Sequence, residues 1–464
     1  MGRDRDLAWI MASTGKRRRR PTAREGGGSI PPTLTDATAP RFWAAVVLTG
    51  VGAGIGGAAL TTLLYQVQHF FWPPASESLL DAAKAAPTWH HVAILVGAGI
   101  LTGLGQLLLV RLSSGNGIEI TTALWFHAGR LPALRTVGSA ILSVIVVGMG
   151  APLGREGAPK QVGAVTANLL SDRAGLSDEQ RRLLVACGAG AGMAAAYDVP
   201  LGGALFALEV LRGVLALRLV LPAITASVIA TIISWTAVPN APTYSIPAFQ
   251  NTTSILCWAL VAGPIAGIVS VGYVRAVQEA DRLRPTGWWR LVAPTIVFAA
   301  LGAVSVWFPQ LLGNGKDVTQ LAFAGQVGPV LILVLLALKP LATVACLGSG
   351  APGGLFTPSL TLGALLGGAL GYGWTLLWPG APLGLFAIIG AGAVLAATTQ
   401  GPISAAVLMI ELTGHDRAFI VPMLIAIGSA TLVARTIDPR SIYDARLTDE
   451  ELTERQTMRQ SSAH

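Results

Sequence analysis

Seven apolar runs of bilayer length recur along the 464-residue chain, and they exclude most soluble folds. Charged residues make up only 12% of the sequence, about half the share in soluble domains. Backbone polar groups inside a bilayer must find partners within their own segment, so these runs are expected to be helices. The runs are Trp43–Tyr65, Val92–Val110, Leu219–Ile233, Ile255–Val274, Leu291–Phe308, Val330–Leu347 and Phe419–Val433. The sequence therefore predicts an all-α polytopic membrane protein.

The distribution of charge indicates an orientation in the membrane. Residues 1–40 contain the cluster KRRRR at 16–20, and no apolar core follows it directly, which excludes a secretory signal peptide. We interpret the cluster as a solvated tail and expect no nucleic-acid partner. Under the positive-inside rule, this tail and the basic turn at 275–290 lie in the cytoplasm. We therefore expect a multi-pass protein of the cell (plasma) membrane with both termini cytoplasmic.

Three pairs of segments match in the same order, which indicates an internal repeat. The offset between partners rises slowly, from 198 through 200 to 202 residues. Three collinear matches are hard to attribute to chance, even in a chain rich in glycine and alanine. The matches join GNGIEIT at 115–121 to GNGKDVT at 313–319, GMGAPLG at 148–154 to GSGAPGG at 348–354, and residues 188–209 to residues 390–411.

The repeat divides the chain into four expected parts. These are a basic disordered cytoplasmic tail at 1–40, a first membrane repeat at 41–237, a second at 254–437, and a short polar cytoplasmic tail at 438–464. In transporters with two such repeats, the halves are commonly inverted relative to each other in the bilayer. Their substrate sites lie near the bilayer midplane, where interrupted helices meet.

The matched segments are also those in which glycine and proline interrupt an apolar pattern. In GMGAPLGREGAPKQVG at 148–163, Arg155 and Glu156 stand where a span would otherwise run. A charge inside a bilayer costs on the order of 3 kcal/mol or more. A helix that begins at this depth exposes N–H groups and a partial positive charge, and several such ends form an anion site. Glu156 at such a helix start can occupy the anion's place when ionised and leave it when protonated.

Three segments resemble the signature motifs of the CLC family of chloride channels and proton-coupled chloride antiporters. They are SSGNGIE at 113–119, GREGAPKQVG at 154–163 and GGLFTPSLTLG at 353–363, in the family's order. AAAYDVPLGGALFALE, AATTQGPISAAVLMIELTG and DPRSIYDAR also resemble the family, so the similarity spans about residues 42–450. The resemblance implies a CLC fold of two inverted-topology repeats of tilted, interrupted helices. It also implies a homodimer with one anion pathway in each subunit.

The family's functional residues are carried over to matching positions of this sequence. Glu156 matches the gating and proton-carrying glutamate. The implied function is transmembrane anion transport, as a voltage-gated chloride channel or a proton-coupled chloride antiporter, through a pore gated by Glu156. The implied partners are a small inorganic anion (chloride, fluoride or nitrate), protons and the lipid bilayer. The expected anion-binding residues are Gly115, Asn116, Gly117, Arg155, Gly157, Leu355, Phe356 and Tyr443.

Two departures from the family pattern leave a second function open. Asn116 stands where chloride-selective members have serine, and Val210 stands where many antiporters have an internal proton-transfer glutamate. A fluoride/proton antiporter of the same fold, exporting fluoride from the cell, is therefore the alternative. Because valine cannot relay protons, the protein is either a passive channel or couples protons by another route.

Other charged residues in the apolar segments are interpreted as structural. Lys160 can snorkel, pair with an acid or add attraction at the pathway, and we favour a structural partner. Glu119 and Asp317, at matching points of the two halves, are read as first-turn acids stabilised by the helix dipole. Glu209 and Glu411 are expected to cap helices or pack at a dimer interface rather than bind a cation.

Enzymatic and metal-binding functions find no support in the motifs. The six histidines have no metal-ligand spacing, and no H-E-x-x-H is present. GNGKDVT lacks the layout of a phosphate-binding loop. Cys187, Cys257 and Cys346 lie in apolar runs without C-x-x-C spacing, so we expect buried thiols. We therefore expect no catalytic site, metal or cofactor.

Overall fold

The described part of the chain is built from helices. A computed structural model describes residues 39–73, 78–112, 119–250, 252–414, 417–445 and 447–462. Within these ranges the one pairing of extended backbone is an isolated antiparallel bridge between Gly154 and Gly354. The predicted all-α class is confirmed for these residues.

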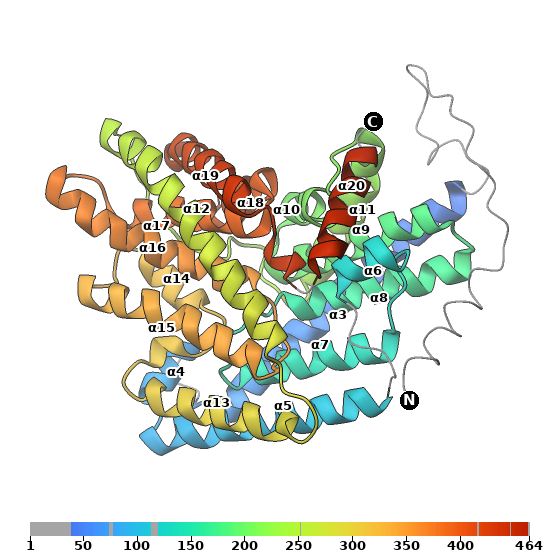
Figure 1. The fold of residues 1–464 in the computed structure, drawn as a ribbon, viewed down its shortest axis with the longest axis horizontal. Coiled ribbons are helices and arrows are strands. Elements are labelled where there is room, and N and C mark those ends of the chain that lie inside the picture. Colours follow the sequence, from blue (N-terminus) through green and yellow to red (C-terminus); the bar gives the residue numbers. More distant parts are fainter. Residues whose placement is uncertain are drawn as a thin grey trace. The chain divides into compact units, whose positions relative to one another are not determined.

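The helices fall into two series of the same order (Figure 1). The first series is α3 (Ala39–Phe71), α5 (Thr88–Leu112), α6 (Ile120–Phe126), α7 (Ala133–Gly148), α8 (Gly157–Ala174), α9 (Asp178–Tyr197), α10 (Pro200–Leu205) with the π-helix η1 (Phe206–Arg212), and α11 (Leu217–Ser234). The second is α12 (Thr253–Arg282), α13 (Trp289–Ser305), α14 (Lys316–Phe323), α15 (Pro329–Gly348), α16 (Phe356–Leu377), α17 (Leu383–Thr399), α18 (Pro402–Thr413) and α19 (Arg417–Ile437). Outside the two series are α4 (Leu79–Ala85), the 3₁₀ turns η2 (Pro309–Leu311) and η3 (Ile442–Asp444), and α20 (Asp449–Ser462).

Backbone conformations repeat along with the helix order. Asp198 ends α9 and Gln400 ends α17, and each has a left-handed φ of 58°. Gly150 and Gly350 have φ values of 114° and 103° at the ends of α7 and α15. A non-glycine residue with positive φ is uncommon, so its occurrence at two matching places is a strong signature of common architecture. The two-repeat fold predicted from the sequence is confirmed.

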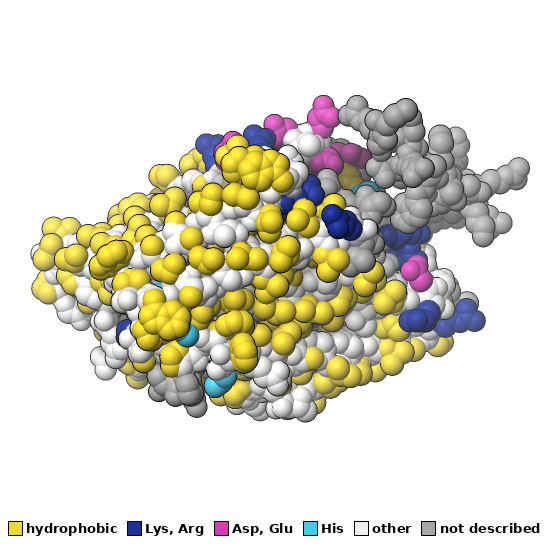
Figure 2. All heavy atoms as spheres, turned by 90° about the horizontal axis from the view of Figure 1, so that it is seen from below, with side chains coloured by type: hydrophobic (Ala, Val, Ile, Leu, Met, Phe, Trp, Pro, Cys, Tyr) yellow, Lys and Arg dark blue, Asp and Glu magenta, His cyan; other side chains and the backbone are white. Residues whose placement is uncertain are grey.

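Among the residues that the structure describes, six helices are long and apolar enough to cross a membrane: α3, α5, α12, α15, α16 and α19. Two of the predicted runs lie in the shorter apolar helices α11 and α13. The helix α16 was not predicted as a span, because glycine, threonine and proline interrupt its apolar pattern. Hydrophobic side chains cover most of the face in Figure 2, with charged side chains gathered toward its margins.

Small residues allow close helix contacts at equivalent places of the two series. On α3, an added Cβ at Gly50 or Gly54 would come within 2.8 Å of a backbone oxygen of α11. Such close approach is how helices gain van der Waals packing in a membrane, where lipid is as apolar as the side chains. The same contact recurs between α12 and α19. The pairs are Gly50 and Gly54 against Ala226 and Ala230, and Gly263 and Gly267 against Ala426 and Ala430.

The expected polar tail at 438–464 contains ordered structure that packs against the membrane part. The side chain of Arg455, on α20, is 2% exposed and forms an ion pair with Asp444. Its guanidinium also donates to the carbonyl of Val210 and lies 5.4 Å from the ring centroid of Trp125. The short polar tail expected at 438–464 therefore includes residues that pack against the membrane part.

Candidate functional site

Two interrupted segments, one from each repeat, meet at the Gly154–Gly354 bridge. The amide of Gly154 donates to the carbonyl of Gly354 at 2.7 Å, and the amide of Gly354 donates back at 2.8 Å. The bridge lies directly before α8 and α16, so it brings the N-termini of these two helices together. A reciprocal exchange between equivalent residues is the contact expected at an approximate two-fold axis.

Glu156, the residue before α8, is fully buried at this junction. Its Oε1 accepts a hydrogen bond of 2.7 Å from the amide of Phe356, the first residue of α16. Its Oε2 accepts from the hydroxyls of Tyr197 at 3.1 Å and Thr357 at 3.2 Å. A helix N-terminus with flanking hydroxyl donors holds one negative charge well. In this structure the carboxylate of Glu156 takes that position.

Glycine is required beside this carboxylate. A Cβ added at Gly154 or at Gly354 would overlap the carboxyl group of Glu156. At Gly157 a Cβ would lie 3.0 Å from the amide nitrogen of Gly354, tighter than ordinary contact. The GREG segment therefore combines a buried carboxylate with backbone that approaches it closely from both repeats.

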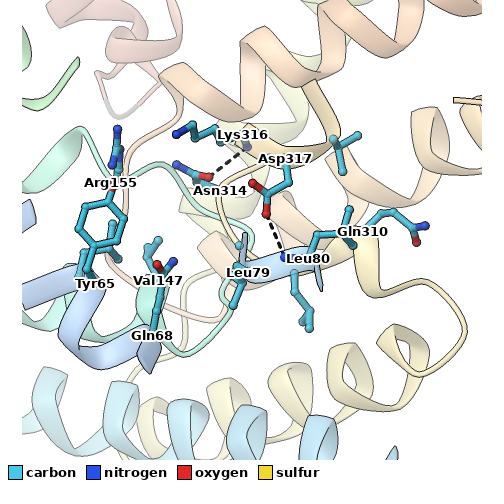
Figure 3. A pocket seen from close by; sticks show the side chains of 15 residues that line it. Tyr65, Gln68, Leu79, Leu80, Val147, Arg155, Gln310, Asn314, Lys316 and Asp317 are labelled. Atoms are coloured by element: carbon cyan, nitrogen blue, oxygen red, sulfur yellow. Dashed lines mark hydrogen bonds between the residues drawn. The ribbon is translucent and has the colours of Figure 1, made fainter. Parts of the chain in front are cut away.

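Arg155 lines a cavity of about 60 Å³ (Figure 3). Its guanidinium donates to the carbonyl of Ala196 at 3.3 Å and lies 4.8 Å from the ring centroid of Tyr197. The cavity is bounded by residues of α3 and α4 and by the loop before α14, with Tyr65, Gln68, Asn314 and Lys316 among its polar lining. Arg155 thus binds the C-terminal end of α9 and contributes a positive charge to the cavity lining.

Tyr443, on η3, lies in a cluster with Phe206 and Lys160. The rings of Tyr443 and Phe206 make an edge-to-face contact at 5.4 Å. The ammonium of Lys160 lies 3.4 Å from the Tyr443 hydroxyl and 4.6 Å from its ring centroid. Among the described residues Lys160 has no acid within ion-pairing distance, so its structural partner is this tyrosine rather than an acid.

Glu209 and Glu411 cap helices across the repeat boundary. The carboxylate of Glu411, on α18, accepts from the amides of Leu201 and Gly202 at the start of α10. The carboxylate of Glu209, on η1, accepts in the same way from Ile403 and Ser404 at the start of α18. The capping role predicted for this pair is confirmed by these contacts.

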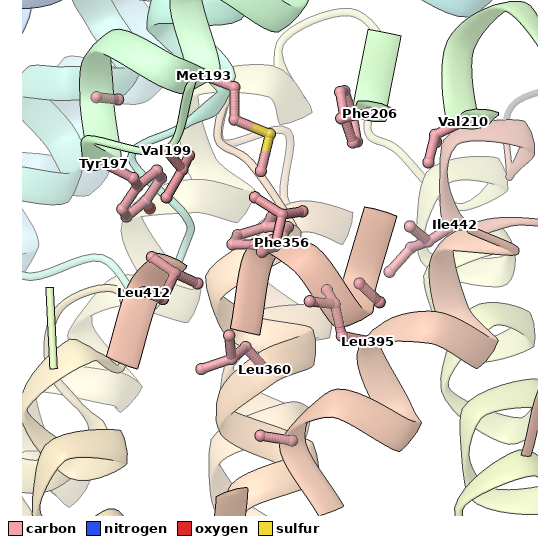
Figure 4. Packing of buried hydrophobic residues seen from close by; sticks show 14 of the residues in the cluster. Met193, Tyr197, Val199, Phe206, Val210, Phe356, Leu360, Leu395, Leu412 and Ile442 are labelled. Atoms are coloured by element: carbon pink, nitrogen blue, oxygen red, sulfur yellow. The ribbon is translucent and has the colours of Figure 1, made fainter. Parts of the chain in front are cut away.

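Apolar side chains enclose the region around Phe356 (Figure 4). Phe356 is 1% exposed, and its ring lies 5.9 Å from that of Tyr197. Met193, Phe206 and Leu395 belong to the same buried cluster. A low-dielectric enclosure strengthens the hydrogen bonds that the Glu156 carboxylate receives.

Of the predicted site residues, the structure brings Glu156, Gly157 and Phe356 into one junction, with Leu355 directly before Phe356. Gly115, Asn116 and Gly117 lie outside the described residues.

Two hydroxyl donors at the junction, Tyr197 and Thr357, were not identified from the sequence. Tyr197 lies forty-one residues from Glu156, and nothing in the pattern around it signals a contact. Thr357 follows Phe356 directly, and its place at a helix start was the available signal. Asp317 is a first-turn acid of α14, as expected, and its carboxylate accepts from the amide of Leu80. In the described ranges no three His, Cys, Asp or Glu residues are grouped to hold a metal ion.

Comparisons with known proteins match most of the membrane part to one protein family. A family model described as voltage gated chloride channel matches residues 98–435. The putative chloride channel protein ClcB-like of Ralstonia nicotianae is 32% identical over 410 residues, covering 85% of this chain and 94% of that protein. The H(+)/Cl(−) exchange transporter ClcA of Vibrio campbellii is 30% identical over 438 residues, 88% of each chain. The crystal structure of a slow cyanobacterial Cl⁻/H⁺ antiporter has a TM-score of 0.76 at 23% identity, covering 92% of this chain and 99% of that one.

Proposed function

The chain belongs to the voltage-gated chloride channel family, the CLC family, and is a multi-pass protein of CLC-type anion transport; we propose that Glu156 gates its anion pathway and carries its proton. The observation that carries this proposal is the hydrogen bond from the Phe356 amide to the buried Glu156 carboxylate. An ionised carboxylate in that position excludes an anion by charge and by volume. A protonated one has no charge for the helix N-terminus to hold, so it can leave and let an anion enter.

The family resemblance and the position of Glu156 support the remaining anion contacts of this proposal. We propose that an anion displacing the carboxylate takes the amides of Gly157, Leu355 and Phe356, and then the hydroxyl of Tyr443. Gly115, Asn116 and Gly117 of the first motif complete the pathway in this proposal. Arg155 faces the cavity beside the junction, and we assign it to attracting anions toward the gate.

The proposal also covers the membrane in which the chain lies, its oligomeric state and its orientation. Large apolar side chains exposed on long helices suit contact with lipid, among them Leu104, Leu260, Leu333 and Leu432. We propose a homodimer in the plasma membrane with both termini cytoplasmic and with repeats bounded at 41–237 and 254–437. Chemical crosslinking in native membranes tests the dimer, and protease protection of an N-terminal tag tests the orientation.

Liposome flux measurements test the gate. The wild-type protein and Glu156→Ala are reconstituted, and chloride efflux and proton uptake are recorded together. We expect Glu156→Ala to carry chloride as fast as wild type or faster, and to lose both proton coupling and pH dependence. Glu279→Ala removes an exposed carboxylate on α12 and is the matched control. A folded Glu156→Ala protein without anion flux would show that the gate is assigned wrongly.

The same assay separates chloride transport from the fluoride alternative. Val210 is buried on η1, where it offers no titratable group, and this favours a mechanism in which one glutamate carries the proton. Uphill proton movement driven by an anion gradient identifies an exchanger, and its absence identifies a channel. Fluoride flux that exceeds chloride flux would identify the alternative.

A further inference from the structure

Lys160 is a buried cation that the gate proposal does not use. It lies four residues after Glu156 on α8, and its amide donates to the Glu156 carbonyl, so both side chains leave the same face of the helix. The residue is 5% exposed. Its ammonium contacts the Tyr443 hydroxyl at 3.4 Å and the faces of two rings, Phe206 at 5.1 Å and Tyr443 at 4.6 Å.

A second buried lysine in this chain shows what a structural ammonium requires. Lys339, on α15, is 1% exposed and donates to four carbonyls, those of Gln310, Leu311, Leu312 and Gly313, at 2.9 to 3.3 Å. An ammonium has three N–H donors. Lys339 satisfies all of them with backbone oxygens, whereas in the described ranges Lys160 donates one long hydrogen bond, to a hydroxyl group.

Lys160 also lacks a carboxylate ligand in the part of the chain that the structure describes. Glu156 and Glu119 are the acids whose charges act on it, and no ion pair of Lys160 with either is found among the described residues. Aromatic faces compensate part of a buried positive charge. The remaining cost of an incompletely solvated buried cation is large unless a negative partner binds. Among the described residues, the buried ammonium of Lys160 therefore has room in its coordination for a negative partner.

We propose that the Lys160 ammonium and the Tyr443 hydroxyl together bind one small monovalent inorganic anion. This subsite rests on the proposed function, because it places a fixed cation in the pathway that Glu156 gates. The hydroxyl of Tyr443 and the free N–H groups of Lys160 all donate to the anion. A full positive charge binds an anion more tightly than backbone dipoles do, so release from this subsite limits the rate of transport.

Chloride titration of the purified full-length protein tests the proposal. Lys160→Met keeps the aliphatic length and removes the charge, and isothermal titration calorimetry gives the chloride Kd. We expect the Kd to rise about tenfold, which corresponds to about 1.4 kcal/mol, and the maximal chloride flux in liposomes to rise. Lys84→Met removes an exposed lysine and is the matched control. A chloride Kd within twofold of wild type in folded Lys160→Met overturns the subsite.

A second measurement decides the question if Lys160→Met does not fold. Wild-type crystals soaked in bromide are expected to show anomalous density within about 3.5 Å of the Lys160 Nζ, a hydrogen-bonding distance. Bromide elsewhere in the pathway, with none beside Lys160, overturns the subsite. A different result would contradict the proposed function itself. Liposomes containing the wild-type protein would then show no anion flux, whatever the Lys160 variants do.

Discussion

Gly154 and Gly354 stand at equivalent positions of the two repeats and exchange a reciprocal pair of backbone hydrogen bonds, at 2.7 and 2.8 Å. This bridge fixes the distance between the N-termini of α8 and α16. It therefore also fixes how far the Glu156 side chain must reach to the amide of Phe356.

Gly154→Ala is expected to displace the Glu156 carboxylate, because the added methyl group overlaps it. Because the carboxylate is the far end of a flexible side chain, we expect the variant to fold with the Glu156 carboxylate displaced. Chloride flux into liposomes at neutral pH should rise several-fold, with weaker proton coupling. Gly272→Ala, on α12, adds a methyl group where no other atom lies within 4 Å and is the control. Unchanged flux and coupling in Gly154→Ala would contradict the observed position of Glu156.

Tyr197→Phe is expected to weaken the binding of the Glu156 carboxylate at the junction. The substitution removes the hydroxyl that donates to Glu156 Oε2 at 3.1 Å. A hydrogen bond to a charged group contributes about 1.5–3 kcal/mol, so the blocking position should be occupied less often by a factor of about ten or more. Flux recorded from pH 5 to pH 8 should exceed that of wild type, because the Glu156 carboxylate blocks the pathway less often. Tyr372→Phe removes a hydroxyl bonded to the Val327 carbonyl, away from the gate, and should leave the flux profile unchanged.

Glu209→Ala and Glu411→Ala are expected to lower stability without altering proton coupling. Each carboxylate caps a helix of the other repeat, and loss of such a cap costs about 0.5–2 kcal/mol. Thermal unfolding in detergent should show a lower Tm for both variants. Loss of proton coupling in folded Glu209→Ala at an unchanged Tm would instead assign this residue to transport.

Lys339→Met is expected to be the most destabilising of these substitutions. It leaves four carbonyls of residues 310–313 without their donor, and such losses in a buried network cost roughly 3 kcal/mol or more. Yield of monodisperse protein by size-exclusion chromatography should fall sharply. Normal yield and Tm would show that water replaces the ammonium. That result would also weaken the contrast drawn between Lys339 and Lys160.

Glu156 and its helix start could be identified from the sequence, because a charged residue flanked by glycines is unusual within an apolar segment. The same reasoning failed for Tyr197, since a tyrosine in an apolar helix is ordinary until its partner is known. It also missed α16 as a span, because its glycine, threonine and proline interrupt the apolar pattern that identifies a span. The packing of the polar segment at 438–464 was also not predicted, because Arg455 contacts the Val210 carbonyl and the Trp125 ring, which lie hundreds of positions away in the sequence.

The amino-acid sequence by itself determined that the chain is helical, lies in a membrane, repeats once and interrupts its helices at matching glycines, because periodicity, hydropathy and internal similarity are local properties. Only the tertiary structure decided which partners the interrupted helices meet. It brought the Glu156 carboxylate to the Phe356 amide and the Lys160 ammonium to the Tyr443 hydroxyl. These contacts join residues 200 and 283 positions apart, and such pairing depends on how the two repeats pack rather than on any local pattern.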